Sequence, residues 1–215
     1  NVTEFNGFLT SKNNAFTVLT AGTKSGNFAT FNYPEDVTFN TDASGANNLI
    51  LTAGAISTHW NTDASGNWST AANWSRGVPT TGTDFDNVFI SRAGADPTVT
   101  ISSGSYTVAA FTCDDSLSIT GGTLTVNGTS TINNLNFSGG TLAGSGNVSL
   151  TGANNWSGGT IGVGQGGSGG VTLLAGKTLS LSGSSTKYLD GGKLTVASDG
   201  VTEWTNGNIY LNKSG

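Results

Sequence analysis

The residues most able to do chemistry in this sequence are few. The chain contains one cysteine, Cys113, and one histidine, His59. A cysteine nucleophile needs an activating base such as histidine nearby, whereas a lone cysteine usually behaves as a small buried hydrophobe. The sequence does not show that these two residues meet, so we interpret Cys113 as a core residue.

Three aspartates are the candidates for holding a metal ion. Asp63, Asp84 and Asp86 lie in one segment and could share a Ca²⁺ if that segment folds back on itself, because calcium takes carboxylate oxygens as ligands. Calcium is the only cofactor that the sequence suggests. The neighbours Asp114 and Asp115 would point to opposite sides of a strand, which favours a solvated corner over an acid–base pair.

Tryptophan is concentrated between residues 57 and 92. Trp60, Trp68 and Trp74 are three of the five tryptophans and precede Gly77-Val78-Pro79. Exposed indole faces would suit stacking on sugar rings, so the segment is a candidate carbohydrate platform. The interpretation that we favour is a hydrophobic plug, because the ends of repetitive folds must be capped.

Composition limits the classes of partner. Charged residues make up 10% of the chain and the net charge is −5. A nucleic-acid-binding protein needs a basic patch, anionic membranes attract basic clusters, and no apolar run is long enough to span a bilayer. We therefore expect neither nucleic acid nor membrane insertion. Low charge with abundant Ser, Thr, Asn and Gly is common in secreted proteins and predicts an extracellular location.

The charged residues do not suggest an enzyme. A β-helix enzyme acting on acidic polysaccharides would need lysine or arginine clustered with carboxylates to neutralise the uronate and abstract a proton. After residue 93 the only cations are scattered lysines: Lys177, Lys187, Lys193 and Lys213. The run Gly162-x-Gly164-x-x-Gly167 matches a dinucleotide pattern, but no helix is expected after it. We expect no catalytic residues.

A recurring glycine corner defines the elements that would position these residues. Ser138-Gly139-Gly140-Thr141-Leu142 returns in altered form along the second half of the chain. Gly-Gly supplies the positive φ that sharp turns demand. We align the aliphatic residue after each corner into one column, at intervals of 16, 18, 19, 18, 15 and 15 residues: Val108, Leu124, Leu142, Ile161, Leu179, Leu194 and Ile209.

Apolar residues alternate with polar ones between these corners. The pairs are Leu117 and Ile119, Leu135 and Phe137, Val148 and Leu150, and Val171 and Leu173. A period of two is the pattern of strands with one buried face, and the repeat is too short for pairs of helices. We predict an all-β fold, a parallel β-helix (β-solenoid) in which each aliphatic residue stacks on its counterpart one turn below. A β-sandwich would explain the alternation but not the column.

The first 56 residues are less repetitive. Two apolar triplets, residues 37–39 and 49–51, flank a polar loop and predict a hairpin, and residues 16–19 predict another strand. We therefore divide the chain into three parts: a strand-rich segment that closes or caps a β-helix (1–56), a Trp-rich capping segment (57–92) and parallel β-helix coils (93–215).

Several stretches resemble modules of very long bacterial surface proteins, of the autotransporter and filamentous-haemagglutinin style. They are SGNWSTAANWSRGVPTTGTDFDNVFI, the PTVTI that follows it, and SLSITGGTLTVNGTSTINNLNFSGGTLAGSGNVSL. The resemblance is specific for the Trp-Trp-Gly-Val-Pro-Asp stretch. It implies a right-handed parallel β-helix in an exported adhesin, stalk or filament, and it carries over no catalytic residue.

These observations predict a non-enzymatic structural repeat module of a bacterial extracellular fibre, stalk or adhesin. We expect copies or adjacent repeats to assemble head-to-tail through backbone pairing and the apolar residues Phe5, Phe8, Trp204 and Tyr210. The alternative is a carbohydrate-binding or polysaccharide-cleaving β-helix protein, with surface glycans as partners.

Overall fold

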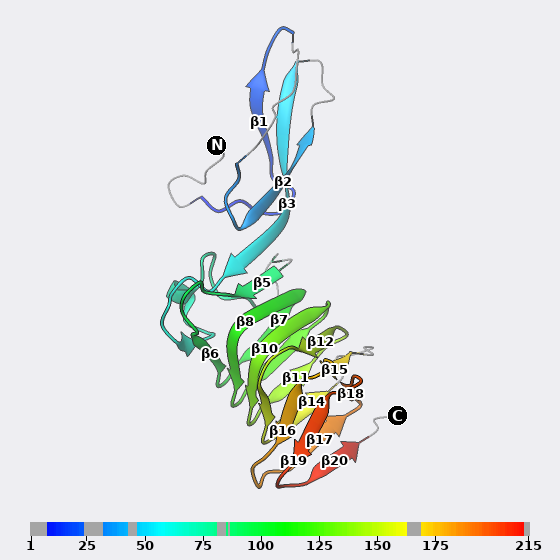
Figure 1. Ribbon diagram of the computed structural model, residues 1–215. Helices are drawn as coiled ribbons and strands as arrows, with labels where there is room; N and C mark the ends of the chain where they lie inside the picture. Colours follow the sequence, from blue (N-terminus) through cyan, green and yellow to red (C-terminus); the bar gives the residue numbers. More distant parts are fainter. Residues whose placement is uncertain are drawn as a thin grey trace.

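The computed structural model describes residues 8–23, 32–42, 47–80, 85, 87–162 and 169–212. Within these ranges the regular structure is all-β, apart from one short 3-10 turn, η1 (Ala71–Asn73). Figure 1 shows two parts: a small antiparallel sheet on the N-terminal side, and a longer stack of parallel strands that leads to the C-terminal side.

The small sheet has three strands. Its central strand is β3 (Asn48–His59), and β1 (Ala15–Thr20) and β2 (Val37–Asp42) pair with it antiparallel on either side. The predicted hairpin and the predicted first strand are therefore confirmed. The sheet has a small core of its own: Val37, Phe39, Leu51, Ala53 and Ile56.

The parallel strands form three rows, which we call rows A, B and C. Row A contains β5 (Asn87–Ile90), the first halves of β8 (Ala110–Ile119) and β10 (Ser130–Phe137), then β12 (Asn147–Leu150), β15 (Gly170–Leu173) and β18 (Lys193–Val196). Row B contains β4 (Gly66–Asn67), β6 (Thr98–Ile101), the second halves of β8 and β10, then β13 (Asn154–Trp156), β16 (Thr178–Leu181) and β19 (Val201–Trp204). Row C contains β7 (Ser105–Val108), β9 (Thr123–Val126), β11 (Thr141–Ala143), β14 (Gly159–Gly162), β17 (Lys187–Asp190) and β20 (Ile209–Asn212).

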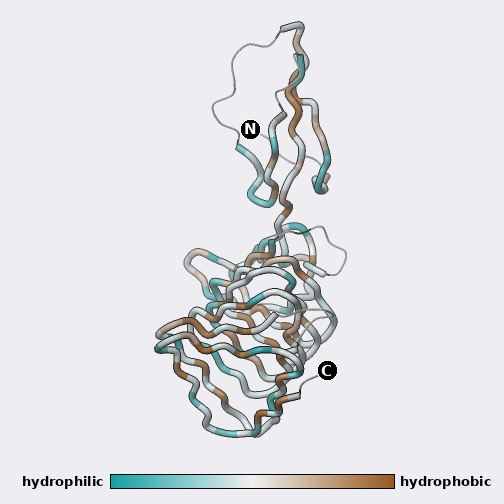
Figure 2. Tube along the Cα trace, turned by 90° about the vertical axis from the view of Figure 1, so that its right-hand side faces the viewer, coloured by the Kyte–Doolittle hydropathy of each residue, from teal (hydrophilic) through white to brown (hydrophobic). Residues whose placement is uncertain are grey.

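The chain visits these rows in a fixed order, from A to B to C, and each visit to all three rows makes one layer. Strands of neighbouring layers pair in parallel, which places the layers about 4.8 Å apart. In strands of every row, such as β5, β6 and β9, buried residues alternate with half-buried ones, so alternate side chains point inward. Hydrophobic positions recur from layer to layer along the trace (Figure 2). The inward residues form one continuous core that runs from Trp60 to Leu181.

The glycine corners have the backbone conformation that their sequence predicts. Gly122 and Gly140 have φ values of 67° and 73°, and each precedes a strand of row C. A Cβ on Gly140 would lie 2.5 Å from the carbonyl oxygen of Gly122 in the layer before it. The corners therefore need glycine for two reasons, the positive φ and the close approach of successive layers.

The predicted aliphatic column is correct only in part. Leu124, Leu142 and Ile161 pair directly in row C, as predicted. The residues that continue this column in the next two layers are Leu189 and Leu211. The predicted Leu179, Leu194 and Ile209 do not continue it, and Val108 does not begin it.

The displaced residues occupy other places in the stack. Leu179 is buried in row B and Leu194 lies in row A, while Ile209 pairs with Lys187 and Val108 pairs with Val126. The reason is that glycine corners also separate rows A and B, and that the layer after Ile161 is longer than those before it. A constant period therefore could not assign the later corners to their rows.

The parallel pairing begins inside the segment predicted as a cap. Ser57, Thr58 and His59, at the end of β3, pair in parallel with residues 87–89 of β5. A single long strand therefore takes part in both the antiparallel sheet and the first layer of the stack (Figure 1).

Candidate functional site

The three tryptophans of the capping segment form one buried cluster at the N-terminal side of the stack. Trp60 and Trp74 share an isolated antiparallel bridge, and their rings meet edge to face at 5.1 Å. Trp68 packs on Trp74 at 4.9 Å and on Phe111 of β8 at 5.7 Å. The exposed fractions of Trp60, Trp68 and Trp74 are 0%, 0% and 4%. The cluster therefore continues the core of the stack.

Each indole N–H of the cluster is bonded within the segment. Nε1 of Trp60 donates to the carbonyl of Ala64 at 3.1 Å, and Nε1 of Trp68 donates to that of Pro79 at 2.9 Å. Nε1 of Trp74 donates to the carbonyl of Trp68 at 2.7 Å. None of the three rings leaves a face open for a sugar. The three tryptophans therefore do not form the exposed aromatic surface that a carbohydrate platform needs. The geometry is that of a plug.

Asp63 is engaged by a cation of the protein itself. Its Oδ1 accepts a hydrogen bond from Nε of Arg92 at 2.9 Å and forms an ion pair with Nη2 of the same residue, also at 2.9 Å. Asp84 and Asp86 lie outside the described residues, so the predicted calcium site has no described geometry. In the described ranges no group of three or more His, Cys, Asp or Glu side chains is placed to hold a metal ion.

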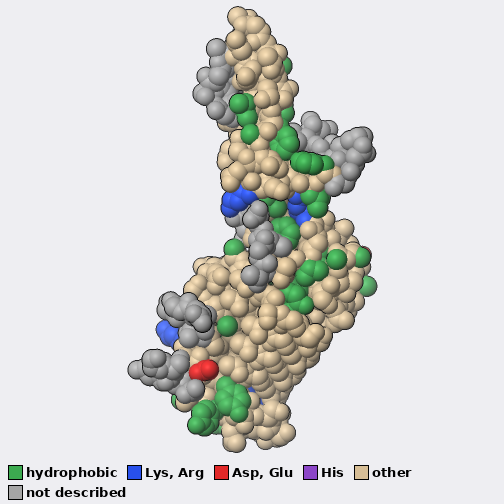
Figure 3. Space-filling model, turned by 180° about the vertical axis from the view of Figure 1, so that it is seen from behind, with side chains coloured by type: hydrophobic (Ala, Val, Ile, Leu, Met, Phe, Trp, Pro, Cys, Tyr) green, Lys and Arg blue, Asp and Glu red, His purple; other side chains and the backbone are tan. Residues whose placement is uncertain are grey.

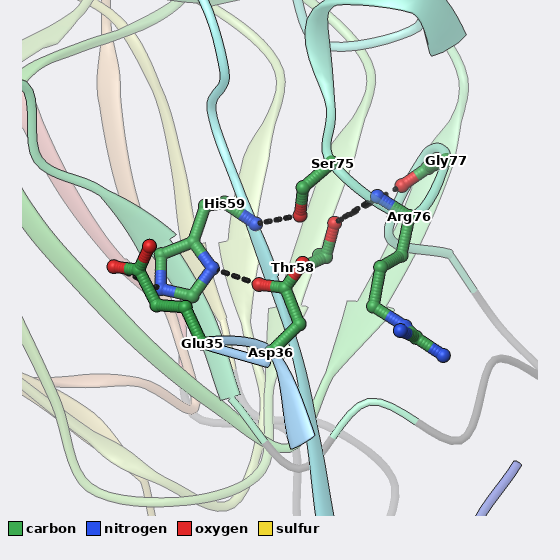
Figure 4. A network of polar contacts seen from close by, with 7 residues as sticks. All are labelled: Glu35, Asp36, Thr58, His59, Ser75, Arg76 and Gly77. Atoms are coloured by element: carbon green, nitrogen blue, oxygen red, sulfur yellow. Dashed lines mark hydrogen bonds and ion pairs between the residues drawn. The ribbon is translucent and has the colours of Figure 1, made fainter. Parts of the chain in front are cut away.

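A polar network joins the small sheet to the first layers of the stack (Figure 4). His59 hydrogen-bonds through Nδ1 to the carboxylate of Asp36, and its Nε2 lies 3.8 Å from Glu35. The imidazole stacks on Phe89 of β5, with the ring centres 4.8 Å apart. The hydrogen bond to Asp36 raises the pKa of His59, against the opposing effect of burial. The imidazolium form of His59 is therefore favoured more strongly than it would be for a free histidine side chain.

The backbone around His59 is fixed by the capping segment. Its N–H donates to Oγ of Ser75 at 2.9 Å, and the N–H of Arg76 donates to Oγ1 of Thr58 at 3.3 Å. Arg76 is buried, and its Nη2 donates to the carbonyl of Thr10 at 2.5 Å. Residues from the N-terminal part, the capping segment and the stack thus share one network. His59 therefore helps to hold these parts of the chain together.

Cys113 and His59 do not form a catalytic pair. Cys113 of β8 pairs with Ile90, whereas His59 pairs with Phe89, one position earlier in β5. Because side chains alternate along strands, the two point to opposite faces. Cys113 is buried, and burial raises the pKa of its thiol. A buried, protonated thiol is inert, which agrees with its interpretation as a core residue.

The predicted assembly residues are exposed wherever the structure describes them. The exposed fractions of Phe8, Trp204 and Tyr210 are 53%, 58% and 60%, and Phe5 lies outside the described residues. Trp204 pairs with the buried Leu181, so it lies on the inward side of β19, in the last described layer. Trp204 is therefore well placed to meet a further layer.

A buried lysine is the feature that the sequence analysis missed. Lys187 of β17 has an exposed fraction of 0%, and its Nζ donates to the carbonyls of Gly183, Ser185 and Asn206 at 3.3 to 3.4 Å. Burial lowers the pKa of its ammonium group. Lys187 takes an inward position beside Gly159, its partner in β14. No local sequence pattern indicates this burial. Only the strand pairing shows that Gly159, which has no side chain, leaves space for the side chain of Lys187.

Comparisons with protein-family models, with curated proteins and with solved structures find no match for this chain. Among the described residues, no helix has the length and apolar character needed to cross a bilayer.

Proposed function

We propose that the chain is a right-handed parallel β-helix that serves as a non-enzymatic structural repeat module of a bacterial extracellular fibre, stalk or adhesin. One observation carries this proposal. The chain visits rows A, B and C in the same order, layer after layer, and every layer pairs in parallel with the next. A fold in which each layer contacts only its neighbours is extended by adding layers, which suits a rod.

Outward Asn and Ser side chains in and beside row B support a structural use, because they link successive layers. Asn155 of β13 donates from Nδ2 to Oδ1 of Asn136 in the layer before, at 3.3 Å. Oγ of Ser182 donates to Oδ1 of the same Asn155 at 2.6 Å. Such uncharged ladders hold successive layers in register and are insensitive to salt, which suits an extracellular rod of low charge.

The last described layer supports head-to-tail assembly. Val196, Trp204 and Leu211 pair with the inward residues Leu173, Leu181 and Leu189, yet they are largely exposed. Strands with unpaired backbone groups and exposed apolar side chains template the addition of further strands. We propose that a second copy or an adjacent repeat covers this surface and contacts Trp204 directly, with Phe8 on the opposite side of the junction.

Sedimentation velocity over a range of concentrations, with electron microscopy of the same samples, tests this proposal. We expect larger species as concentration rises and rods in the micrographs. Trp204→Asp should abolish the shift, because a charge would be buried at the junction. Thr178→Asp, at an exposed position one layer earlier in row B, is the matched control and should assemble normally. Assembly that Trp204→Asp leaves unchanged, or a monomer at every concentration, would refute the head-to-tail contact.

A further inference from the structure

The outward face of row C changes character in its last layers. Earlier outward positions carry small side chains, among them Thr123, Thr141 and Thr160, which pair one above the other. The next two members of this file are Tyr188 of β17 and Tyr210 of β20. Two large aromatic rings therefore follow a run of threonines.

The two tyrosines remain exposed although they are neighbours. Their ring centres are 5.9 Å apart with 56° between the planes, and their exposed fractions are 42% and 60%. Tyr188 lies between Lys187 and Leu189, whose side chains point toward the core, so the strand itself directs Tyr188 outward. The rings are thus held by paired strands instead of collapsing onto the surface.

The pair borders an open hollow of about 240 Å³ lined by Thr160, Tyr188, Asp190 and Tyr210. Asp190 lies two residues after Tyr188 and so shares its outward face. Its partner in the layer before is Gly162, which has no side chain to fill the space above it. Figure 3 shows hydrophobic side chains gathered beside an acidic one near the end of the stack that lies away from the small sheet.

We propose that this hollow is a saccharide-binding site for neutral hexose units of a glycan. The apolar faces of the two tyrosines suit the C–H face of a pyranose ring, and a tyrosine ring offers an apolar body with a polar tip. The carboxylate of Asp190 can accept hydrogen bonds from sugar hydroxyls, and the hydroxyl of Thr160 can donate or accept them. A few placed polar groups around an apolar surface are the usual composition of a ligand site.

The charges around the hollow select against acidic glycans. Asp190 is the charged residue among those lining it, and the chain as a whole carries a net charge of −5. A uronate or a sialylated unit would place its carboxylate near that of Asp190, which costs free energy through like-charge repulsion. Neutral hexoses avoid this penalty.

An aromatic pair on neighbouring strands can also serve only to stabilise the sheet. Two features of this pair are not needed to stabilise a sheet and favour ligand binding: the rings are turned to solvent, and a hollow with a carboxylate lies beside them. The site lies on the outward face, whereas the proposed head-to-tail contact uses inward residues such as Trp204. Tyr210, which the sequence analysis named as an assembly residue, points outward and belongs to the hollow instead.

Saturation-transfer NMR with neutral hexaoses (malto-, cello-, laminari- and mannohexaose) and with oligogalacturonate as the acidic probe tests the assignment. We expect transfer to at least one neutral hexaose, with a dissociation constant of about 1 mM, and none to oligogalacturonate. Tyr188→Ala and Tyr210→Ala should each weaken binding about tenfold or more, as central contact residues do.

Thr178→Ala is the control, because it shortens an exposed side chain of row B that does not line the hollow. It should bind the hexaose as the parent chain does, and thermal melting should show that all the variants fold. The proposal is overturned if no neutral hexaose receives saturation, if the tyrosine variants bind as well as the parent chain, or if oligogalacturonate is preferred. Because Trp204→Asp reports on assembly alone, a failure here is distinguishable from a failure of the structural proposal.

Discussion

His59 links the two parts of the molecule through contacts that sequence spacing does not reveal. Its ring stacks on Phe89 of β5 and contacts the carboxylates of Glu35 and Asp36, which directly precede β2 of the small sheet. Those carboxylates precede His59 by more than twenty residues, across a hairpin whose register the sequence leaves open. Sequence reasoning could name the only histidine, but its partners depend on the strand pairing.

The titration of His59 should follow from these contacts. The hydrogen bond to Asp36 raises the pKa of His59 above its ordinary value of 6.5. The contact therefore stabilises the fold fully below about pH 6.5, and this stabilisation is lost as the pH rises through the folded-state pKa. NMR titration of the single imidazole should give a midpoint above 6.5, and the melting temperature should fall over the same pH window.

Asp36→Asn is the control for this titration. It keeps the size of the side chain but removes the negative charge, so the midpoint should move down and the melting temperature should become less dependent on pH. A midpoint at or below 6.5 in the parent chain would contradict the His59–Asp36 contact.

The tryptophans show what residue types alone can predict. Their density between residues 57 and 92 indicated either a sugar platform or a plug, and both interpretations use the same rings. Burial separates them, because all three indoles pack into the core and donate to backbone carbonyls. Which face of a ring is covered depends on how η1 and the following loop fold back, and residue types do not specify that path.

At the scale of the element, the strands were the most predictable feature. Period-two alternation marks β8, β10, β12 and β15, and their predicted inward residues are buried. Register was predictable only while layers kept nearly the same length, as from Leu124 through Leu142 to Ile161. After Ile161, one layer is longer than those before it, and similar glycine corners separate different rows. The repeat interval therefore no longer predicts which residues pair.

The corner glycines give a prediction with a built-in control. Gly140 has φ 73° and no room for a Cβ, while Gly176 has φ 67° and no atom within 4 Å of the Cβ position. Gly176→Ala should therefore cost only the left-handed backbone conformation, about 1–2 kcal/mol. Gly140→Ala should cost an additional 1–3 kcal/mol or so, because its methyl group would press on the preceding layer.

Urea unfolding of the two variants would measure this difference in the free energy of unfolding. Because the two glycines share nearly the same φ, the backbone cost cancels and the remainder reports the spacing of the layers. Equal losses would mean that successive layers are not held at the close approach seen at Gly122 and Gly140.

At the scale of the whole molecule, burial is high through the middle of the stack and falls toward its last layers and toward β1 of the small sheet. In β8 every residue except Asp114 is buried or half-buried, whereas every residue of β19 is exposed and β1 is almost entirely exposed. In a fold where each layer is stabilised by its neighbours, the terminal layers have one neighbour and should open most often. The stack therefore carries a gradient of local stability along its axis.

Hydrogen exchange followed by mass spectrometry should record this gradient. At low concentration, the backbone amides of β8 and β10 should exchange most slowly, and those of β1 and of β18, β19 and β20 fastest, because local opening there exposes little apolar surface. Raising the concentration should slow exchange in β18–β20 selectively, since a second copy would pair with these strands, and Trp204→Asp should remove that effect. Uniform protection along the stack at low concentration would show that the layers open as one unit and not from the ends inward.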